Sequence, residues 1–446
     1  MRRKPRRRFR AATVRERYAS FAIASIVILL TACAAGAQVR TLTLREAVDL
    51  ALKQSPEVAK ARIDETKAAS AVRVAHDPFD PKIAAGSGLA YSSGLPMSIE
   101  GATPSIFQAQ ASKFVFNRQQ THLVAQARED ARGAAIATAA KREEIALRAA
   151  LAYLEAERAA RIAELLQREV GSLERVAQTV RLRVGEGREL PLETKRVDLN
   201  LAKARQRLQA IESERAYAES SLASFLGFDS DEPVRVVVED RSPLKLPESE
   251  EASAGGALAS SKELRRLESA MLAKGSEVKA QKAARLPRVD LVAQYALLGK
   301  FNNYEQFFNK FQRHNGQIGV SFTIPLFTGP AADALAAQAS GEVARLRLEM
   351  QTTRNRISME SRRLYRQVKQ AETGRDVARL DLELVRDELT VLLARMEEGR
   401  ASLREVEQGR LAEDEKWMAF IDANYSLETA KLNLLHETGD LLAALR

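Results

Sequence analysis

A stretch of 67 residues, Arg118–Val184, contains no proline and carries its large apolar side chains mostly at steps of three and four. This spacing places one narrow apolar stripe on a helix, as in a coiled coil. A helix of that length would extend roughly 100 Å, several times the width of an ordinary domain. A second stretch of this kind covers Ala331–Met396. The sequence therefore predicts an elongated, mainly helical molecule with another structure attached at one end. The apolar stripe of the first stretch consists of Leu147, Leu151, Leu154, Ile162, Leu165, Leu173, Val176, Val180 and Val184.

The N-terminal segment has the pattern of an export signal. Residues 1–17 hold nine Lys or Arg and one Glu, a net charge of +8, and the apolar core Phe21–Leu30 and small residues follow them. A retained membrane anchor is the alternative, but the strongly apolar run is short for a membrane span. Removing the signal lowers the formal net charge from +10 to +2. The charge therefore gives no reason to expect a nucleic-acid partner.

The only cysteine, Cys33, follows Leu30-Thr-Ala, and this tetrapeptide resembles the lipobox of bacterial lipoproteins. In that interpretation the signal covers residues 1–32 and the thiol of Cys33 is lipidated. Ordinary cleavage after Ala37 is also compatible with the sequence, so both alternatives stay open. In either case no disulfide is expected, and packing or assembly must stabilise the exported chain.

Four short segments have the alternation of β-strands and fall into two pairs. The first pair is Lys82–Tyr91 with Ile106–Phe116, joined by a loop over Ser92–Ser105, and the second is Val289–Leu297 with Ile318–Ile324. Strands of about ten residues have the length that crosses a bilayer in a tilted barrel. Thirteen of the 24 aromatic residues lie in 79–116 and 288–327, as expected for strands with interfacial aromatic rings. A small soluble sandwich at the end of a coiled coil is the alternative.

The chain also contains an internal repeat. Glu263 and Pro287 follow Glu57 and Pro81 at one common offset, and Glu398-Gly399-Arg400 repeats Glu186-Gly187-Arg188 at nearly the same offset. Each half reads as a helix, two strands, a long helix, a tight turn and a returning helix. We expect a first repeat over residues 38–228, a polar connector over 229–256 with a short strand at 234–238, and a second repeat over 257–446.

Local signals mark where the first helices begin and end. Thr43 and Glu46 have the spacing of a capping box, Ser55-Pro56-Glu57 restarts a helix, and Asp77-Pro78 ends it near His76.

Four strands cannot form a closed wall alone. An unpaired strand edge in lipid leaves backbone groups without partners, at a cost of several kcal/mol each. If the strands span a membrane, identical copies must contribute strands to one shared barrel, and a closed ring is the common symmetric solution.

These residues resemble the TolC-like outer-membrane efflux proteins of Gram-negative bacteria. The resemblance covers about residues 40–440 and is carried by the following motifs: Leu42-Thr-Leu-Arg-Glu-Ala47, Ala51-Leu52, Ser55-Pro56-Glu57, Ile324-Pro-Leu-Phe-Thr-Gly329 and the two Gly turns. It implies a mainly α fold with membrane β, in which a homotrimer forms one twelve-stranded barrel in outer-membrane lipid, continued by a periplasmic α-helical barrel. It also implies an inner-membrane transporter and a periplasmic adaptor (membrane fusion) protein as partners. The expected function is a passive outer-membrane exit duct of a tripartite efflux or secretion system.

Two other classes remain as alternatives. A periplasmic adaptor with a coiled-coil hairpin would contain one hairpin flanked by small β domains, whereas this chain repeats hairpin and strands twice. A soluble coiled-coil scaffold is disfavoured by the leader and by the aromatic strands.

No residue pattern indicates an enzyme, a cofactor or a metal site. His76, His122, His314 and His436 are scattered, with no Cys, Asp or Glu at ligand spacing. Gly185-Glu-Gly187 lacks the third glycine and the preceding strand of a dinucleotide-binding loop, so a tight turn between helices is expected.

The resemblance assigns two groups of site residues. The adaptor is expected to dock at the two turns, and an acidic periplasmic gate is expected just after the second turn, with Gln408 standing where the family carries a second acid. Ordinary turn residues and a solvated helical face are the alternatives. The docking residues are Gly187, Arg188, Leu190, Gly399, Arg400, Ser402 and Leu403, and the gate residues are Glu405, Glu407 and Gln408.

Overall fold

The computed structural model describes residues 40–88, 105–228, 234–239, 241, 244–298, 312, 314–326 and 329–445. Cys33, the export signal, the end of the first predicted strand and the loop that follows it lie outside these residues. The chain divides into two compact units. Unit 1 comprises the described parts of Met1–Ala47, Ala149–Arg241 and Leu384–Tyr425, and unit 2 those of Val48–Arg148, Ser242–Glu383 and Ser426–Arg446.

The first elements follow the local signals of the sequence. After strand β1 (Arg40–Leu42), helix α2 (Leu44–Gln54) begins with the predicted capping box. The Glu46 carboxylate accepts from the Thr43 backbone N–H at 2.9 Å, and the Thr43 hydroxyl accepts from the Glu46 N–H at 3.3 Å. Ser55 caps helix α3 (Pro56–His76), which ends at the short 3₁₀ helix η1 (Asp77–Phe79).

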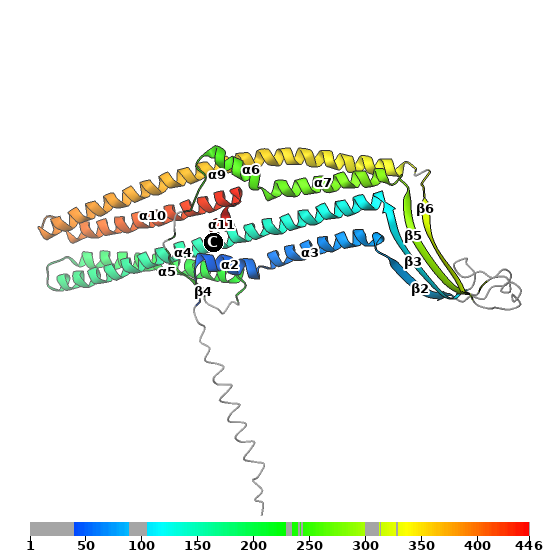
Figure 1. Cartoon of the computed structure of the whole chain (residues 1–446). Helices are drawn as coiled ribbons and strands as arrows, with labels where there is room; N and C mark the ends of the chain where they lie inside the picture. The colour runs from blue at the N-terminus through cyan, green and yellow to red at the C-terminus, as the bar shows by residue number, and fades with distance from the viewer. Residues whose placement is uncertain are drawn as a thin grey trace, which may run out of the picture. The chain divides into compact units, whose positions relative to one another are not determined.

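Unit 2 contains one antiparallel sheet in the order β2-β3-β5-β6. Its strands are β2 (Lys82–Gly88), β3 (Ser105–Asn117), β5 (Arg288–Leu298) and β6 (His314–Thr323). Figure 1 shows them side by side, with β2 and β6 at the two edges. Both predicted strand pairs are therefore present, and the central β3–β5 pairing joins the first half of the chain to the second.

The two faces of this sheet differ in polarity. One face is apolar between β5 and β6: Val289 lies opposite Phe322, Leu291 opposite Val320 and Ala293 opposite Ile318. On the other face glutamines are neighbours across three strands: Gln110 lies opposite Gln294, which accepts a hydrogen bond from the Gln317 amide. Ile318, Val320 and Phe322 are each more than half exposed, so none of the described residues covers this part of the apolar face.

Long helices account for most of the remaining structure. They are α4 (Arg118–Gly185), α5 (Pro191–Phe225), α9 (Ala331–Glu397) and α10 (Leu403–Thr438), followed by the single turn α11 (Leu441–Ala444). The predicted bounds of the two longest helices differ from these by one residue at most. Among the described helices, none has a segment that is long and apolar enough to cross a bilayer.

Six residues of the predicted apolar stripe of α4 are buried, whereas Leu147, Leu151 and Val184 are half-buried, and alanines contribute to the helix packing as much as leucines. In unit 1, Ala159, Ile162, Ala163, Leu165 and Leu166 pack with Ile211 of α5 and Ile421 of α10. Small side chains let neighbouring helix backbones approach closely, so a narrow stripe is enough to hold them together.

The structure differs from the expected connector over residues 229–256 at its C-terminal end. Strand β4 (Val234–Val236) is present, but helix α6 (Glu250–Ser260) begins inside the segment and helix α7 (Lys262–Ala283) follows it. The Ser249 hydroxyl caps α6 by accepting from the Ala252 N–H at 3.0 Å. Gly255 and Gly256 have low helix propensity, so the sequence favours a loop at this position.

A pairing that the sequence did not predict is the parallel contact of β1 with β4 in unit 1. The fully buried Tyr153 of α4 fixes this small sheet. Its hydroxyl lies 2.6 Å from the Val237 carbonyl oxygen and 3.1 Å from that of Leu42. Burial raises the pKa of Tyr153 to about 12, so the hydroxyl keeps the proton that it donates.

Candidate functional site

Two tight turns close the long helical hairpins of unit 1, and they have the same geometry. Gly187 ends α4 with φ 71°, and Gly399 ends α9 with φ 75°. In the first turn the Arg188 N–H donates to the Arg183 carbonyl at 2.8 Å, and in the second the Arg400 N–H donates to the Arg395 carbonyl at 2.7 Å. This six-residue ring closed at a left-handed glycine is the Schellman motif, which satisfies the last carbonyls of a helix.

The surfaces of the two turns are also alike. Arg188 lies 3.3 Å from Glu186, and Arg400 lies 3.2 Å from Glu398, with both arginines largely exposed. Leu190, which follows the first turn, is 67% exposed. Each turn therefore presents one Arg–Glu pair, and the first also presents an uncovered leucine.

Both turns border one groove of about 490 Å³ in unit 1. The groove is apolar along α4, whereas both apolar and polar side chains line it along α5 and α10. Of the predicted docking residues, Ser402 and Leu403 line it, and the other five lie in the turns outside its lining. The groove is lined by Leu173, Val176, Val180, Glu189, Glu193, Arg196, Val197, Leu199, Asn200, Ser402, Leu403, Arg404, Glu407, Gln408 and Leu411.

The three predicted gate residues have three different environments. Glu405 belongs to the capping box of α10: its carboxylate accepts from the Ser402 N–H at 2.7 Å and from the Ser402 hydroxyl at 2.8 Å. These hydrogen bonds lower the pKa of Glu405. Glu407 is buried, and burial raises its pKa although Arg410 lies 3.6 Å away. Gln408 is exposed and lines the groove.

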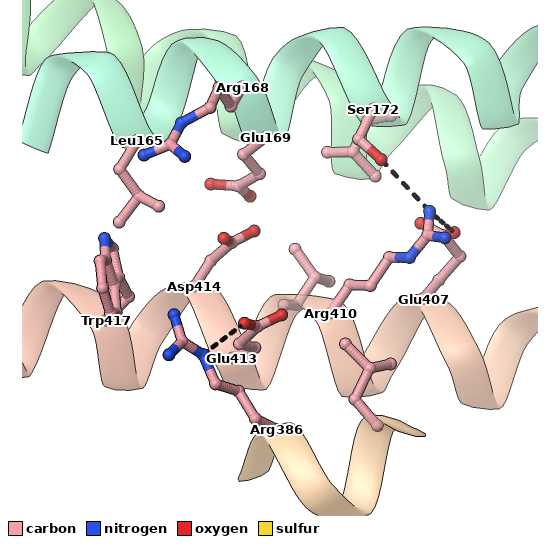
Figure 2. Close-up of a pocket in the computed structure, with 13 residues that line it drawn as sticks. Leu165, Arg168, Glu169, Ser172, Arg386, Glu407, Arg410, Glu413, Asp414 and Trp417 are labelled. Carbon is pink, nitrogen blue, oxygen red and sulfur yellow. Dashed lines mark hydrogen bonds and ion pairs between the residues drawn. The ribbon is translucent and has the colours of Figure 1, made fainter. Parts of the chain in front are cut away.

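A second pocket, of about 280 Å³, lies between α4, α9 and α10 in unit 1 and shares Glu407 with the groove. Figure 2 shows that charged side chains from all three helices converge there. Arg386 of α9 donates to Glu413 at 3.0 Å and stacks over the Trp417 ring at 4.4 Å. Arg410 donates to the Ser172 hydroxyl at 3.2 Å.

Two acids in this pocket, Glu169 and Asp414, were not identified from the sequence. A signal for Glu169 was present, because it lies four residues after Leu165 and four before Leu173, both in the apolar stripe. An ionisable residue at such a position is buried when the helix packs. Asp414 carries no comparable signal, since charged residues precede and follow it.

Within the part of the chain that the structure describes, no group of three or more His, Cys, Asp or Glu side chains is arranged to hold a metal ion. The described site offers a groove of mixed polarity, charged turns and partly or fully buried carboxyl groups.

Comparison with protein families identifies the chain. The family model described as outer membrane efflux protein matches residues 47–228 and 254–440, which together are most of the sequence. The chain belongs to the outer membrane efflux protein family. This confirms the resemblance found in the sequence, and it indicates an outer-membrane efflux channel. A comparison with curated protein sequences gives no match.

Solved structures of outer-membrane channels have the same fold. CusC superimposes with a TM-score of 0.71 at 15% identity, covering 89% of this chain and 91% of that chain. The CmeC outer membrane channel of Campylobacter jejuni superimposes with a TM-score of 0.69 at 15% identity, covering 89% of this chain and 86% of that chain. The outer membrane protein VceC of Vibrio cholerae superimposes with a TM-score of 0.67 at 18% identity, covering 89% of this chain and 96% of that chain. At these identities the likeness concerns the fold.

Proposed function

We propose that this member of the outer membrane efflux protein family is the passive exit duct of a tripartite efflux or secretion system. In this proposal its strands lie in the outer membrane and its helices in the periplasm. A periplasmic adaptor docks on the helical turns and links the duct to an inner-membrane transporter. The observation that carries the proposal is the four-stranded sheet, whose one face is apolar and exposed while the other carries glutamines.

The sheet supports assembly into a homotrimer. Within the described residues β2 and β6 each pair on one side only, so each leaves one edge without a partner. Backbone groups left unpaired in lipid cost several kcal/mol each, and closure with two further copies would satisfy them in a barrel of twelve strands. The apolar face would then contact lipid, and the glutamine face would line an aqueous bore.

The tests of this assembly are its oligomeric state and its conductance. The mature protein, extracted from outer membranes with detergent, is expected to migrate as a trimer that heating converts to monomer. In planar bilayers the same trimer is expected to conduct ions. A protein that is monomeric and freely soluble without detergent would contradict the proposal and favour the alternative, a periplasmic adaptor.

We propose further that the adaptor docks at Gly187, Arg188, Leu190, Gly399, Arg400, Ser402 and Leu403. The groove between the two turns supports this, because it joins apolar side chains of α4 to polar ones of α5 and α10. A photo-crosslinking residue at Leu190 or Leu403 is expected to link the trimer to a periplasmic protein with a coiled-coil hairpin. The same residue at exposed Leu348 in unit 2 serves as control. Equal crosslinking at all three positions would refute docking at the turns.

The gate is proposed at Glu405, Glu407 and Gln408. Acids from three copies gathered on one axis would repel each other, so adaptor binding would need to supply only a few kcal/mol to open the helices. The double replacement Glu405→Ala and Glu407→Ala is expected to raise single-channel conductance and to weaken its block by divalent cations. Unchanged conductance and block would remove the gate from these residues.

Cys33 is proposed as the lipid acceptor. The intact mass of the mature protein distinguishes an acylated Cys33 from a chain that begins after Ala37.

A further inference from the structure

One buried carboxylate in unit 1 lacks part of its hydrogen bonding. Glu169 of α4 is only 4% exposed. Its Oε1 accepts from the Arg207 guanidinium of α5 at 2.6 Å, but its Oε2 has no hydrogen-bond partner among the described residues. A buried, ionised oxygen without a donor is costly, and proteins rarely leave one unsatisfied.

The group that faces this oxygen is another acid. Figure 2 shows the carboxyl groups of Glu169 on α4 and Asp414 on α10 pointing toward one another across the pocket. Two ionised carboxylates in this position would repel each other, whereas a proton on one of them turns the same contact into a hydrogen bond.

The surrounding cations do not neutralise the pair. Arg386 of α9 is bound to Glu413, and Arg410 of α10 is bound to Ser172 and Glu407. Arg168 of α4 is exposed, which leaves Arg207 as the one cation in hydrogen-bond contact with either acid among the described residues. Without a hydrogen bond, Arg168 also acts on Asp414 through its charge, and it is opposed by the nearby acids Glu413 and Glu415 of α10.

We propose that Glu169 and Asp414 form a proton-binding site that stabilises the packing of α10 against α4 in unit 1. With one proton bound, the Asp414 carboxyl donates its O–H to Glu169 Oε2, and the hairpin ends stay packed. When that proton leaves to water, both groups carry charge, the hydrogen bond is lost and α10 is loosened from α4. The site goes beyond the exit-duct proposal and does not depend on it.

Both carboxyl groups of the pair have raised pKa values. Burial, followed by the charges of Glu169 and Glu413, raises the pKa of Asp414 to about 7, while Arg207 and Arg168 oppose the shift. Burial also raises the pKa of Glu169, against the effect of Arg207. An acid whose pKa is raised by folding stabilises the fold below its ordinary pKa and loses that contribution as the pH rises through the folded value. The packing of α10 on α4 should therefore weaken near neutral pH.

The test is hydrogen exchange of the full mature protein in detergent between about pH 5.5 and about pH 8.5, corrected for intrinsic exchange. In the wild type, protection of residues 403–425 is expected to fall about tenfold over this range, chiefly below pH 7, and to level off above it. Asp414→Asn keeps an N–H donor facing Glu169 but cannot ionise, so its protection should not depend on pH. Asp387→Asn on α9 and Glu164→Gln on α4 are matched controls, because both residues are exposed in unit 1, and each should keep the wild-type profile.

Glu169→Gln provides an independent readout if Asp414→Asn does not fold. Without the second charge Asp414 should titrate lower, and the midpoint of the protection profile should move to lower pH by about one unit. A flat wild-type profile overturns the proposal. An unchanged profile in Asp414→Asn, an unchanged midpoint in Glu169→Gln, or an equal loss of pH dependence in the controls does so as well.

Discussion

Replacing Gly439 by alanine should destabilise unit 2 more than an ordinary glycine substitution at a turn. Gly439 follows α10 with φ 78°, and the next residue closes the helix end through the Asp440 N–H, which donates to the Leu435 carbonyl at 2.9 Å. A Cβ at this position would lie 2.7 Å from the Ser260 Cβ and 2.8 Å from its Oγ. The substitution therefore combines an unfavourable backbone conformation with a close contact to α6.

The two costs can be separated with the turn glycines. Left-handed backbone costs a residue with a Cβ roughly 1–2 kcal/mol. Gly187 and Gly399 have similar φ values, but a methyl group added at either would have no atom within 4 Å, so only this cost applies to them. At Gly439 the contact with Ser260 adds about 1–3 kcal/mol, as for other overpacked sites. We expect a total of about 2–5 kcal/mol for Gly439→Ala, against about 1–2 kcal/mol for Gly187→Ala or Gly399→Ala.

The assay is equilibrium unfolding in denaturant, followed by circular dichroism, for the single variants and for Gly439→Ala combined with Ser260→Gly. Removing the Ser260 Cβ relieves the contact, so the double variant should recover about 1–3 kcal/mol relative to the sum of the single effects. If Gly439→Ala costs no more than Gly187→Ala, or if the two changes are additive, α6 does not approach Gly439 closely and the reasoning is wrong.

Three further variants test other contacts of the fold. Tyr153→Phe should cost about 1–2 kcal/mol in unfolding free energy, because the Val237 carbonyl loses a buried donor; no change would mean that the hydroxyl does not hold β1 and β4. Hydrogen bonds from Ser402 lower the pKa of Glu405, so the stabilisation that Glu405 gives to the start of α10 is present above the ordinary glutamate pKa and is lost as the pH falls through the lowered value. Amide protection at the start of α10 should therefore fall in acid in the wild type but not in Glu405→Gln. Gly409→Ala should cost less than about 1.5 kcal/mol, because the added methyl would meet only flexible leucine side-chain ends at 3.1 Å and 3.2 Å, and a larger loss by thermal unfolding would indicate that these side chains cannot move.

The elements that the sequence predicted well are those whose signal is local and long. The apolar period of Arg118–Val184 extends over many turns, and the alternation Ile318-Gly-Val-Ser-Phe fixes which side of β6 is apolar. Capping residues such as Thr43 and Ser55 then define where helices begin, because each satisfies backbone N–H groups that the helix leaves free.

The features that the sequence did not reveal depend on distant partners or on context. Strands β1 and β4 have three residues each, too few for a period, and they pair across most of the first half of the chain. The position of Glu169 between Leu165 and Leu173 in the apolar stripe indicates burial, but the sequence does not show that Arg207 of α5 and Asp414 of α10 are its neighbours. Glu405 was assigned to a gate by resemblance, whereas the structure adds its capping of α10, which requires knowing that the helix begins at Leu403.

The β3–β5 pairing constrains the order in which this chain can mature. The partner of β3 is translated only after α4, α5, α6 and α7 have been made, so the first hairpin leaves the ribosome with the β3 edge that pairs with β5 still open. An exposed edge is a template for aggregation. The open edge of β3 therefore has to stay unpaired with other chains until the second half is made, and a truncated first half alone should aggregate.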